Sequence, residues 1–396
     1  MENVAAKVKG KQQDLSSVLF ILGFMAFFAN GDNYAVAPLL IDIAQDLQIE
    51  VNTAALSVTA YMLSFGLFTI IFGPLGDRFG KTRIIKIAAF GTATFSSLGA
   101  VAFNLSSLVV LRTINGAFAA GIFPITMALI GESFSDRNRQ NAIAKVMGMM
   151  FLGGASATAI GGLLAYVGSW RLVYLFYGLA EFVIAIIMLR ILKKSKGSID
   201  SLNFKEVYGQ AFANKDLLTA VGIIFLVGFT VFGSFTYSGD FVQNVTGLNI
   251  LFVGLILSFF GLGAVAGGRK AGDLRNKFGS KFLLFAGLLA SISLFTLSMT
   301  ETVIVIIIAL FGFGWGFVSL QSTLVAYAQK AMPKLKGTAM SMASFAMFVG
   351  GGIGTFVNGK IIDISSLQTI FILAGIIAIF LGLFSYKKIE VNKLKM

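Results

Sequence analysis

Long apolar runs separated by short polar connections are the dominant pattern of this chain. A helix that crosses a hydrocarbon core needs roughly 20 apolar residues in succession, and twelve runs approach or exceed that length. The pattern therefore predicts an all-α membrane protein with twelve spans. The expected spans are residues 17–40, 54–74, 84–103, 107–130, 143–166, 172–192, 217–241, 250–268, 282–299, 302–328, 338–358 and 366–386.

One long polar stretch interrupts the alternation of runs and short connections. It occupies residues 193–216, between the sixth and seventh runs. We interpret it as a cytoplasmic linker between two six-helix bundles, at residues 17–192 and 217–386. The remaining residues, 1–16 and 387–396, are then short polar tails on the same side of the membrane.

The distribution of charge predicts the orientation of the spans. Of the 31 Lys and Arg residues, all but Arg112, Arg171 and Lys360 fall in the two tails or in every second connection. Because cytoplasmic connections are enriched in cations, both termini are predicted to be cytoplasmic, in a multi-pass protein of the plasma or inner membrane. The net charge of +13 then reflects orientation and contact with the lipid bilayer, and no nucleic-acid partner is expected.

Composition narrows the chemistry further. Only 12% of residues are charged and 57% are apolar, against about 25% charged in ordinary soluble proteins. The chain has neither Cys nor His, which excludes disulfides, Cys or His metal sites and histidine-dependent triads. The segment from Gly76 to Thr82 is one residue too short for a phosphate-binding P-loop. We expect no metal, no cofactor and no ATP site.

The two halves of the sequence repeat each other weakly. Gly153–Gly154 aligns with Gly350–Gly351 and Gly162 with Gly359, both at an offset of 197 residues. Gly80 has a counterpart in Gly279, each inside a basic connection. Six spans per half give the halves the same orientation, related by an axis along the membrane normal. Two-halved secondary transporters have this arrangement, with a midplane site between the halves.

The connection between the second and third spans contains the most specific motif. Small residues allow two helices to approach closely, Gly80 permits a tight turn, and Asp77 can pair with a cation. The loop resembles the signature of the major facilitator superfamily, and this resemblance implies two six-helix bundles that rock about a central cavity. It also implies a conformational latch in which Asp77 helps to hold the outward-open state. The predicted latch residues are Gly73, Gly76, Asp77, Arg78, Gly80, Lys81 and Arg83.

Charges inside the apolar runs are the strongest candidates for mechanism, because each is costly in lipid. Asp32 lies roughly 22 Å into the first span at 1.5 Å per residue, and Arg112 lies at a similar depth in the fourth. We predict that they pair. Residues Leu111 to Ala117 resemble the superfamily's fourth-span motif, which implies that Arg112 and Asp32 take part in proton coupling; a purely structural ion pair is the alternative. Glu181, near the midplane, is a third coupling candidate or a structural residue.

The resemblance further implies that spans 1, 4, 7 and 10 line the substrate cavity. The candidates are Asn30, Asn115, Phe235, Tyr237, Trp315 and Gln321. Their mixture of apolar faces with sparse hydrogen-bonding groups suits an amphipathic ligand. The sequence from Phe232 to Tyr237 and onward resembles the drug and sugar-efflux branch of the superfamily.

These observations predict a monomeric transporter, not an enzyme, that exports small, largely hydrophobic compounds by proton antiport. One alternative is a sugar or metabolite exporter of the same fold. A second is a non-transporting receptor, which the short loops disfavour because they leave no binding domain. The Gly-Pro pair typical of antiporters is replaced by Ala157–Thr158, which leaves uniport and symport open.

Overall fold

The computed structural model describes residues 2–134, 136–197, 204–333 and 335–389, and all regular structure within these ranges is helical. The predicted all-α class is therefore confirmed. The first half contains α1 (Glu2–Tyr34), η1 (Ala37–Leu39), α2 (Leu40–Leu47), α3 (Val51–Ala54), α4 (Leu56–Phe79), α5 (Lys81–Gly99), α6 (Leu105–Ala119), α7 (Phe123–Ser133), α8 (Asp136–Val167) and α9 (Trp170–Ile191). The rest comprises α10 (Phe204–Ala213), α11 (Lys215–Phe235), α12 (Ser238–Thr246), α13 (Ile250–Phe278), α14 (Lys281–Met299), α15 (Val303–Ala331), α16 (Lys336–Ile364) and α17 (Leu367–Lys388).

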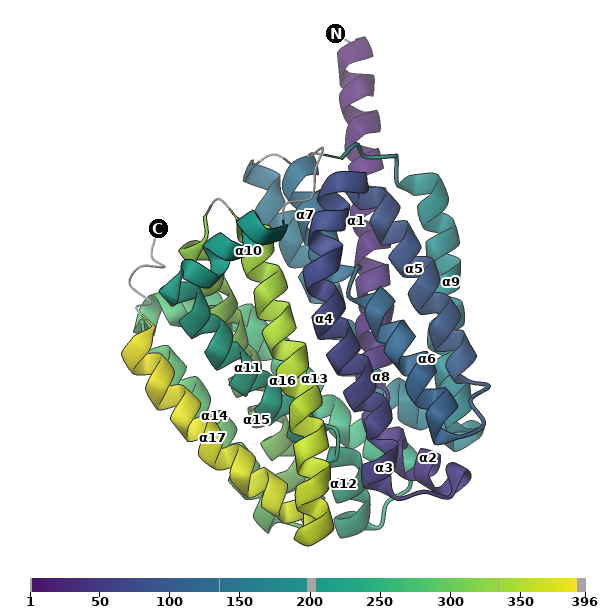
Figure 1. The fold of residues 1–396 in the computed structure, drawn as a ribbon, viewed down its shortest axis with the longest axis vertical. Coiled ribbons are helices and arrows are strands. Elements are labelled where there is room, and N and C mark those ends of the chain that lie inside the picture. The colour runs from purple at the N-terminus through teal and green to yellow at the C-terminus, as the bar shows by residue number, and fades with distance from the viewer. Residues whose placement is uncertain (1, 135, 198–203, 334, 390–396) are drawn as a thin grey trace.

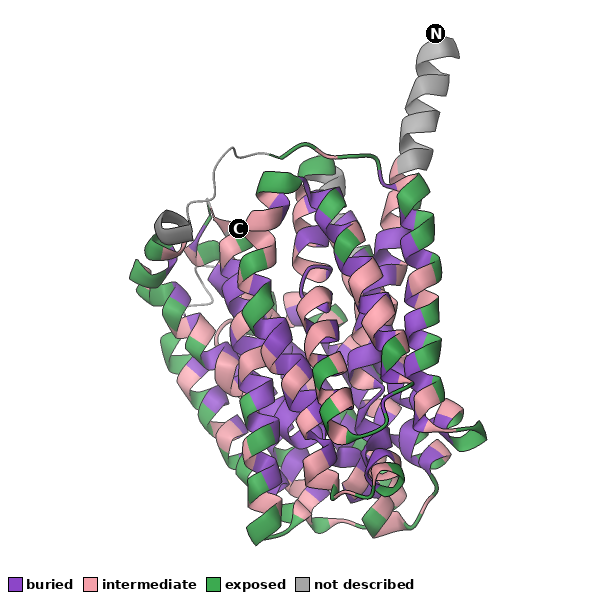
Figure 2. Ribbon diagram, turned by 45° about the vertical axis from the view of Figure 1, so that its right-hand side comes forward, coloured by how far each residue is buried: buried purple, intermediate pink, exposed green. Residues whose placement is uncertain are grey.

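All twelve predicted spans fall on helical segments. Among the described residues, eleven segments are long and apolar enough to cross a membrane. The twelfth, α5, is less apolar because Lys81, Arg83 and Lys86 occupy its first turns. It lies alongside the other long helices, between α6 and α9 (Figure 1). Large apolar side chains remain exposed on the outer surface of the bundle (Figure 2), as expected for helices that face lipid.

Spans 1, 4 and 7 are each broken, although their hydropathy patterns predicted continuous helices. The first breaks between α1 and η1, the fourth between α6 and α7, and the seventh between α11 and α12. Pro38 and Pro124 stand at the start of the segments that follow the first two breaks, where a missing N–H is tolerated. Interrupted helices at membrane depth are stable only where they are buried in protein or line a cavity, so we expect these three breaks to face the interior of the bundle.

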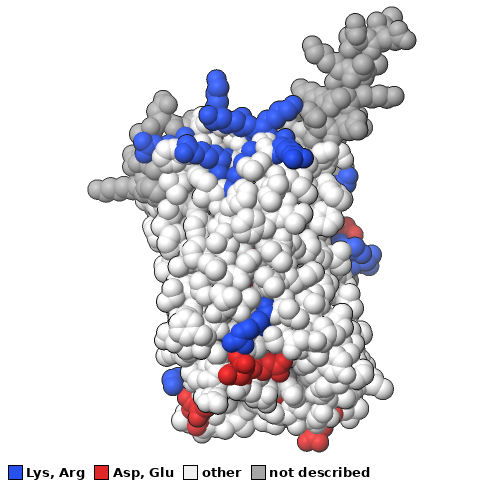
Figure 3. All heavy atoms as spheres, turned by 90° about the vertical axis from the view of Figure 1, so that its right-hand side faces the viewer, with Lys and Arg blue, Asp and Glu red and all other residues white. Residues whose placement is uncertain are grey.

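The two ends of the bundle differ in charge. Helix α1 begins and α17 ends at the same end (Figure 1), where Lys and Arg side chains gather (Figure 3). We call this end the basic face. The other end, the acidic face, is formed by short helices such as α2, α3 and α12, and includes Asp42 and Asp46.

Glycines set the distance between helices within each half. A Cβ atom at Gly153 on α8 would overlap the carbonyl oxygen of Phe27 on α1. In the second half, a Cβ at Gly350 on α16 would overlap the carbonyl oxygen of Phe225 on α11 in the same way. The helix pairs α1–α8 and α11–α16 are therefore equivalent, and the repeat predicted from sequence is present in the packing.

Two further helix pairs join the halves. Helix α8 packs on α13, where Gly162 meets Gly254 backbone to backbone, and α4 packs on α16, where a Cβ at Gly66 would contact the backbone of Phe345. We call these two contacts the seams. Small residues bring the backbones of α8 and α13 together over a short, smooth surface. At the seam of α4 and α16, the side chain of Val349 also lies against Gly66.

The predicted linker contains an unexpected helix, α10. Its Tyr208 hydroxyl donates a hydrogen bond to the carbonyl oxygen of Ile70 on α4, at 2.9 Å. Burial raises the pKa of Tyr208 to about 12, further above physiological pH than the ordinary tyrosine value of about 10. The linker therefore attaches to the first half through a stable donor.

The glycine contacts make a matched prediction on one helix. Gly153→Ala should destabilise the protein by about 1–3 kcal/mol, because the added methyl group overpacks a backbone contact. Gly148→Ala on the same helix should not, because no atom lies within 4 Å of a Cβ there. Thermal unfolding of the two purified variants in one detergent checks this. Equal melting temperatures would contradict the packing argument.

Candidate functional site

A buried ion pair lies in the interior of the first half. Asp32 on α1 and Arg112 on α6 are each about 1% exposed, and the Arg112 Nη1 to Asp32 Oδ2 distance is 2.9 Å. The predicted pair is therefore present. Ser96 on α5 donates a second hydrogen bond to Asp32 Oδ1, at 3.1 Å. Such a pair avoids the cost of a lone charge in a low-dielectric interior.

Aromatic rings enclose the guanidinium group. Its carbon lies 4.1 Å from the ring centroid of Tyr61 on α4 and 5.4 Å from that of Tyr174 on α9. A cation is attracted to the face of an aromatic ring, and the rings also exclude water. Close approach of α4 is possible because Gly116, one turn after Arg112, has the carbonyl of Tyr61 directly against it. Arg112 Nε and Nη2 have no hydrogen-bond partner among the described residues.

Glu181 on α9 is a second acid in this cluster. It is fully buried, and neither of its carboxylate oxygens has a hydrogen-bond partner in the described part of the chain. Thr92 of α5 is its neighbour, and Asp32 and Arg112 are near enough to act on it electrostatically. The cluster thus contains two acids and one cation in a space that excludes solvent.

A cavity of about 380 Å³ lies between the two halves, beside this cluster. It extends from Asn33 and Tyr61 in the interior to Gln329 and Met340, near the basic-face ends of α15 and α16. None of the described residues that line it is charged. Aromatic rings and methionines form much of the wall. They include a stacked pair across the halves, Phe65 and Phe348, with ring centroids 3.8 Å apart.

The structure places the six predicted cavity residues in different environments. Asn30 and Gln321 line the cavity. Asn115 is buried behind it and donates to the carbonyl of Thr92, at 3.1 Å. Phe235 lies in a second layer, with its ring 4.3 Å from that of Phe260.

Tyr237 and Trp315 also point away from the cavity. The Tyr237 hydroxyl donates to the carbonyl of Thr355, at 2.9 Å, next to the break in span 7. Trp315 packs on Phe282 of α14, 6.1 Å between centroids. Because it is two residues before Phe317, which does line the cavity, it points about 200° around the helix from that side chain.

Sequence reasoning missed the residue that joins the charges to the cavity. Tyr61 both lines the cavity and covers Arg112, so a movement of the guanidinium changes the cavity wall. It lies on α4, outside the four spans that the resemblance designated. Asn33, next to Asp32 in sequence, also lines the cavity. A second polar residue beside the acid in an apolar run could have identified it as a cavity residue.

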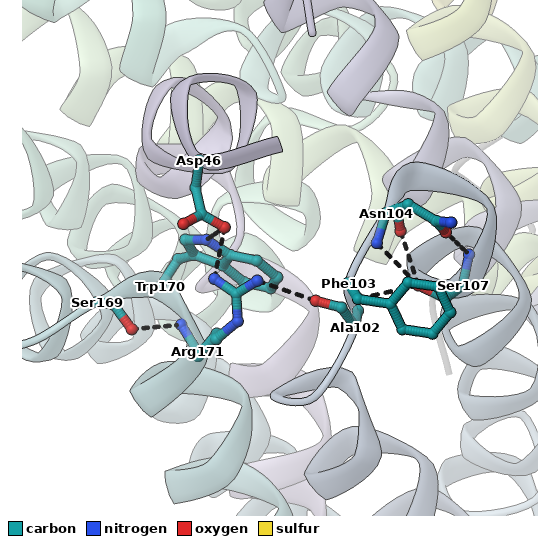
Figure 4. Close-up of polar contacts among 8 residues, drawn as sticks. All are labelled: Asp46, Ala102, Phe103, Asn104, Ser107, Ser169, Trp170 and Arg171. Atoms are coloured by element: carbon teal, nitrogen blue, oxygen red, sulfur yellow. Dashed lines mark hydrogen bonds and ion pairs between the residues drawn. The ribbon is translucent and has the colours of Figure 1, made fainter. Parts of the chain in front are cut away.

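The acidic face is closed by polar contacts. Arg171 at the start of α9 pairs with Asp46 of α2 and donates to the carbonyl of Ala102, at 2.9 Å (Figure 4). Its guanidinium carbon lies 4.2 Å from the ring centroid of Trp170, which it covers. Between the halves, the Asn52 side chain donates a hydrogen bond to Asp363 of α16. The halves also meet where the backbone of Ala37 and Pro38 packs on Gly239 of α12. No residue of α2, α3 or α12 is among the described residues that line the cavity, and the lining extends instead toward the basic face.

The structure brings only some of the predicted latch residues together. Lys81 Nζ lies 2.8 Å from Asp77 Oδ1 and 2.6 Å from Glu132 Oε1 at the end of α7. Gly80 has a φ of +92°, which favours glycine, and Gly76 packs on Ile125. The remaining members point elsewhere: Gly73 faces Ser341 of α16, Arg78 covers the ring of Phe79, and Arg83 is exposed.

Comparisons with known proteins agree with this architecture. The family model of the Major Facilitator Superfamily matches residues 22–355. An uncharacterized transporter of Buchnera aphidicola subsp. Schizaphis graminum is 25% identical over 370 residues, which cover 90% of this chain and 87% of that protein. The puromycin resistance protein of Streptomyces alboniger is 31% identical over 141 residues, 35% of this chain and 28% of that protein.

A solved structure has the same fold. It is a bacterial homologue of the human lysosomal transporter Spinster in an inward-facing, unoccupied conformation, with a TM-score of 0.75 at 16% identity. The similarity covers 96% of this chain and 97% of that one.

The buried cluster predicts unequal effects of two conservative substitutions. Asp32→Asn should destabilise the protein by about 3 kcal/mol or more, because it leaves Arg112 without its ion-pair partner. Glu181→Gln should leave stability nearly unchanged, because an amide replaces a carboxyl group that has no cation bound directly to it. Thermal unfolding in detergent measures both, and equal losses would contradict the asymmetry.

Proposed function

We propose that this chain, which belongs to the Major Facilitator Superfamily of membrane transporters, exports small, largely hydrophobic or amphipathic compounds by proton antiport. The observation that supports this most directly is the position of the Asp32–Arg112 pair. It is buried beside a central cavity whose described lining is uncharged, and the ring of Tyr61 touches both the guanidinium group and the cavity. Because the same aromatic ring borders the proposed proton site and the proposed substrate site, a change at one site can move the wall of the other.

The proton in this proposal binds to Asp32. When the carboxylate is ionised it holds Arg112 at 2.9 Å. Protonation from the outside removes the negative charge, and the guanidinium loses its main electrostatic partner. Arg112 and the Tyr61 ring that it covers then change position, which favours release of substrate and return to the inward state.

Glu181 acts in the proposal as the resting holder of a proton. With Asp32 and Arg112 neutralising each other, an ionised Glu181 would leave a net negative charge in a space that excludes water, at a cost of several kcal/mol. Its oxygens lack hydrogen-bond partners among the described residues, which is consistent with a neutral carboxyl group. Such a group can take part in proton transfer when Asp32 changes its charge.

The cavity supports a substrate of low polarity. Its volume of about 380 Å³ lies within the range of small-molecule sites, about 300–1,000 Å³. Methionines such as Met147 and Met150 give the wall a soft, adaptable surface, and amides such as Gln321 supply a few directional hydrogen bonds. Hydrogen-bonding side chains are a minority among the described lining residues, which disfavours highly polar sugars or metabolites, the alternative that the sequence left open.

Orientation completes the proposed cycle. If the basic face is cytoplasmic, as the charge distribution predicts, the cavity takes substrate from the cytoplasm, and the closed acidic face must open for export. The name of one relative, a puromycin resistance protein, is consistent with export of a hydrophobic compound.

The first test measures coupling in proteoliposomes. The substrate is chosen by thermal stabilisation across drugs, sugars and amino acids at two pH values. Asp32→Asn should reduce transport driven by a pH gradient by at least about tenfold, a coupling energy in the ordinary range, while substrate counterflow without a gradient continues. Asp240→Asn, an acid at the acidic-face end of span 7, is the matched control. Full proton-driven transport by Asp32→Asn would exclude Asp32 as the coupling site.

The second test concerns the latch. Asp77→Asn removes one of the two acids beside Lys81. These three residues all belong to the first half, so the direction of the effect rests on the role that the resemblance implies for Asp77, which is to hold the outward-open state. Its loss should therefore shift the resting population inward. Because the chain has no Cys, Gln329→Cys in the cavity lining provides a single reporter for a membrane-impermeant maleimide. We expect faster labelling from the basic face, by about fivefold or more. Asp216→Asn, an exposed acid at the start of α11, is the control, and an unchanged rate would argue against the latch.

A further inference from the structure

A groove crosses the outer surface of the first half, away from the central cavity. It lies between α5, α6 and α9, and its volume of about 610 Å³ is that of a ligand site. One end contains Arg83 and Lys86, and the remainder is lined mainly by apolar side chains such as Ile87, Phe90 and Phe95. The groove is thus basic at one end and apolar along its length.

The length of the groove corresponds to one leaflet of a bilayer. Arg83 and Phe95 are twelve residues apart on α5, which is about 18 Å along a helix. Half of a hydrocarbon core about 30 Å thick is about 15 Å. With the two cations at the depth of lipid headgroups, the groove extends along the whole of one leaflet and reaches slightly past the midplane at Phe95.

The apolar part of the groove has a flat aromatic wall. Phe118 of α6 stacks on Phe95 with 5.9 Å between centroids and 11° between planes. Its ring occupies the space beside Gly91, where a Cβ atom would overlap it. Thr94 donates its hydroxyl to the carbonyl of Phe90, at 2.8 Å, so this polar side chain does not need water. A hydrocarbon chain can lie along this surface without desolvating an unpaired polar group.

The basic end lacks acidic partners within the described part of the chain. Arg83 is exposed and forms no ion pair there; Lys86 donates to the carbonyl of Leu192, at 2.7 Å, which leaves two of its three protons. The segment after α9 folds back onto this end. The Ser195 amide donates to the Thr82 hydroxyl, at 2.9 Å, and the Thr82 amide donates to the Ser195 hydroxyl, at 3.0 Å.

Exposed cations flank this Ser195–Thr82 contact. They are Lys193, Lys194 and Lys196, and Lys and Arg side chains gather along the basic edge of this side of the molecule (Figure 3). We propose that the groove binds an anionic glycerophospholipid from the leaflet at the basic face. Its phosphate contacts Arg83 and Lys86, and an acyl chain lies along Ile87 to Phe95. The excess of cations favours a headgroup with net negative charge over a zwitterionic one.

Thermal unfolding of the purified protein in detergent tests this site. Added phosphatidylglycerol should raise the melting temperature by about 2 °C or more, and phosphatidylcholine with the same acyl chains should raise it clearly less. Arg83→Gln combined with Lys86→Gln should lose the difference between the two lipids. Lys270→Gln, an exposed cation in the connection after the eighth span, should retain it.

A second variant separates the acyl chain from the headgroup. Thr94→Trp fills the middle of the groove and leaves both cations in place, so it should also lose the phosphatidylglycerol effect. Native mass spectrometry should show one retained phosphatidylglycerol on the wild type and none on either groove variant. Because it detects the bound lipid directly, it tests the site with Thr94→Trp alone if the variant that combines Arg83→Gln with Lys86→Gln is unstable. Equal stabilisation of wild type and groove variants, equal effects of the two lipids, or the same effect from inorganic phosphate would each overturn the proposal.

Discussion

The cost of an unpaired charge inside an apolar bundle governs where this protein places its ionisable groups. The three cations that the sequence puts outside the basic face each have an acid beside them: Arg112 pairs with Asp32, Arg171 with Asp46, and Lys360 with Asp363. Five helices contribute to the first of these pairs through its two charged residues, Ser96 and two tyrosine rings. The packing of the first half depends on keeping this cation neutralised and dry.

The two halves share a scaffold and differ in chemistry. Equivalent glycines fix α8 against α1 and α16 against α11, so the geometry is repeated. Among the described residues, however, every buried charged side chain belongs to the first half. Helix α11, the counterpart of α1, carries hydroxyl groups at Thr230 and Ser234 that donate to carbonyls of their own helix. The second half thus supplies an uncharged wall of the central cavity, and the proposed proton site lies in the first half, on the opposite side of that cavity.

Sequence alone predicted the features that depend on how apolar each segment is and on how deep each charged residue lies in the membrane. The spans, the repeat and the Asp32–Arg112 pair follow from apolar length and from the cost of burying charge. The rotation of each helix did not follow, because it is set by contacts between distant segments. Trp315 was therefore assigned to the cavity although it packs on α14, and Tyr61 was overlooked although it covers Arg112. The breaks in the spans were missed because hydropathy reports how apolar a segment is and not whether its backbone stays helical.

The seams have a consequence for how such a protein changes over generations. At Gly162 and Gly254 the halves meet backbone to backbone, so the interface constrains the size of a side chain there more than its chemical identity. Helices α4 and α16 also meet through larger side chains, such as Phe65 and Phe348. Away from these contacts, a mutation deep inside one half needs no compensating change in the other. Each half can diverge under its own selection while the joint between them stays intact, and acidic chemistry can accumulate on one side of a symmetric frame.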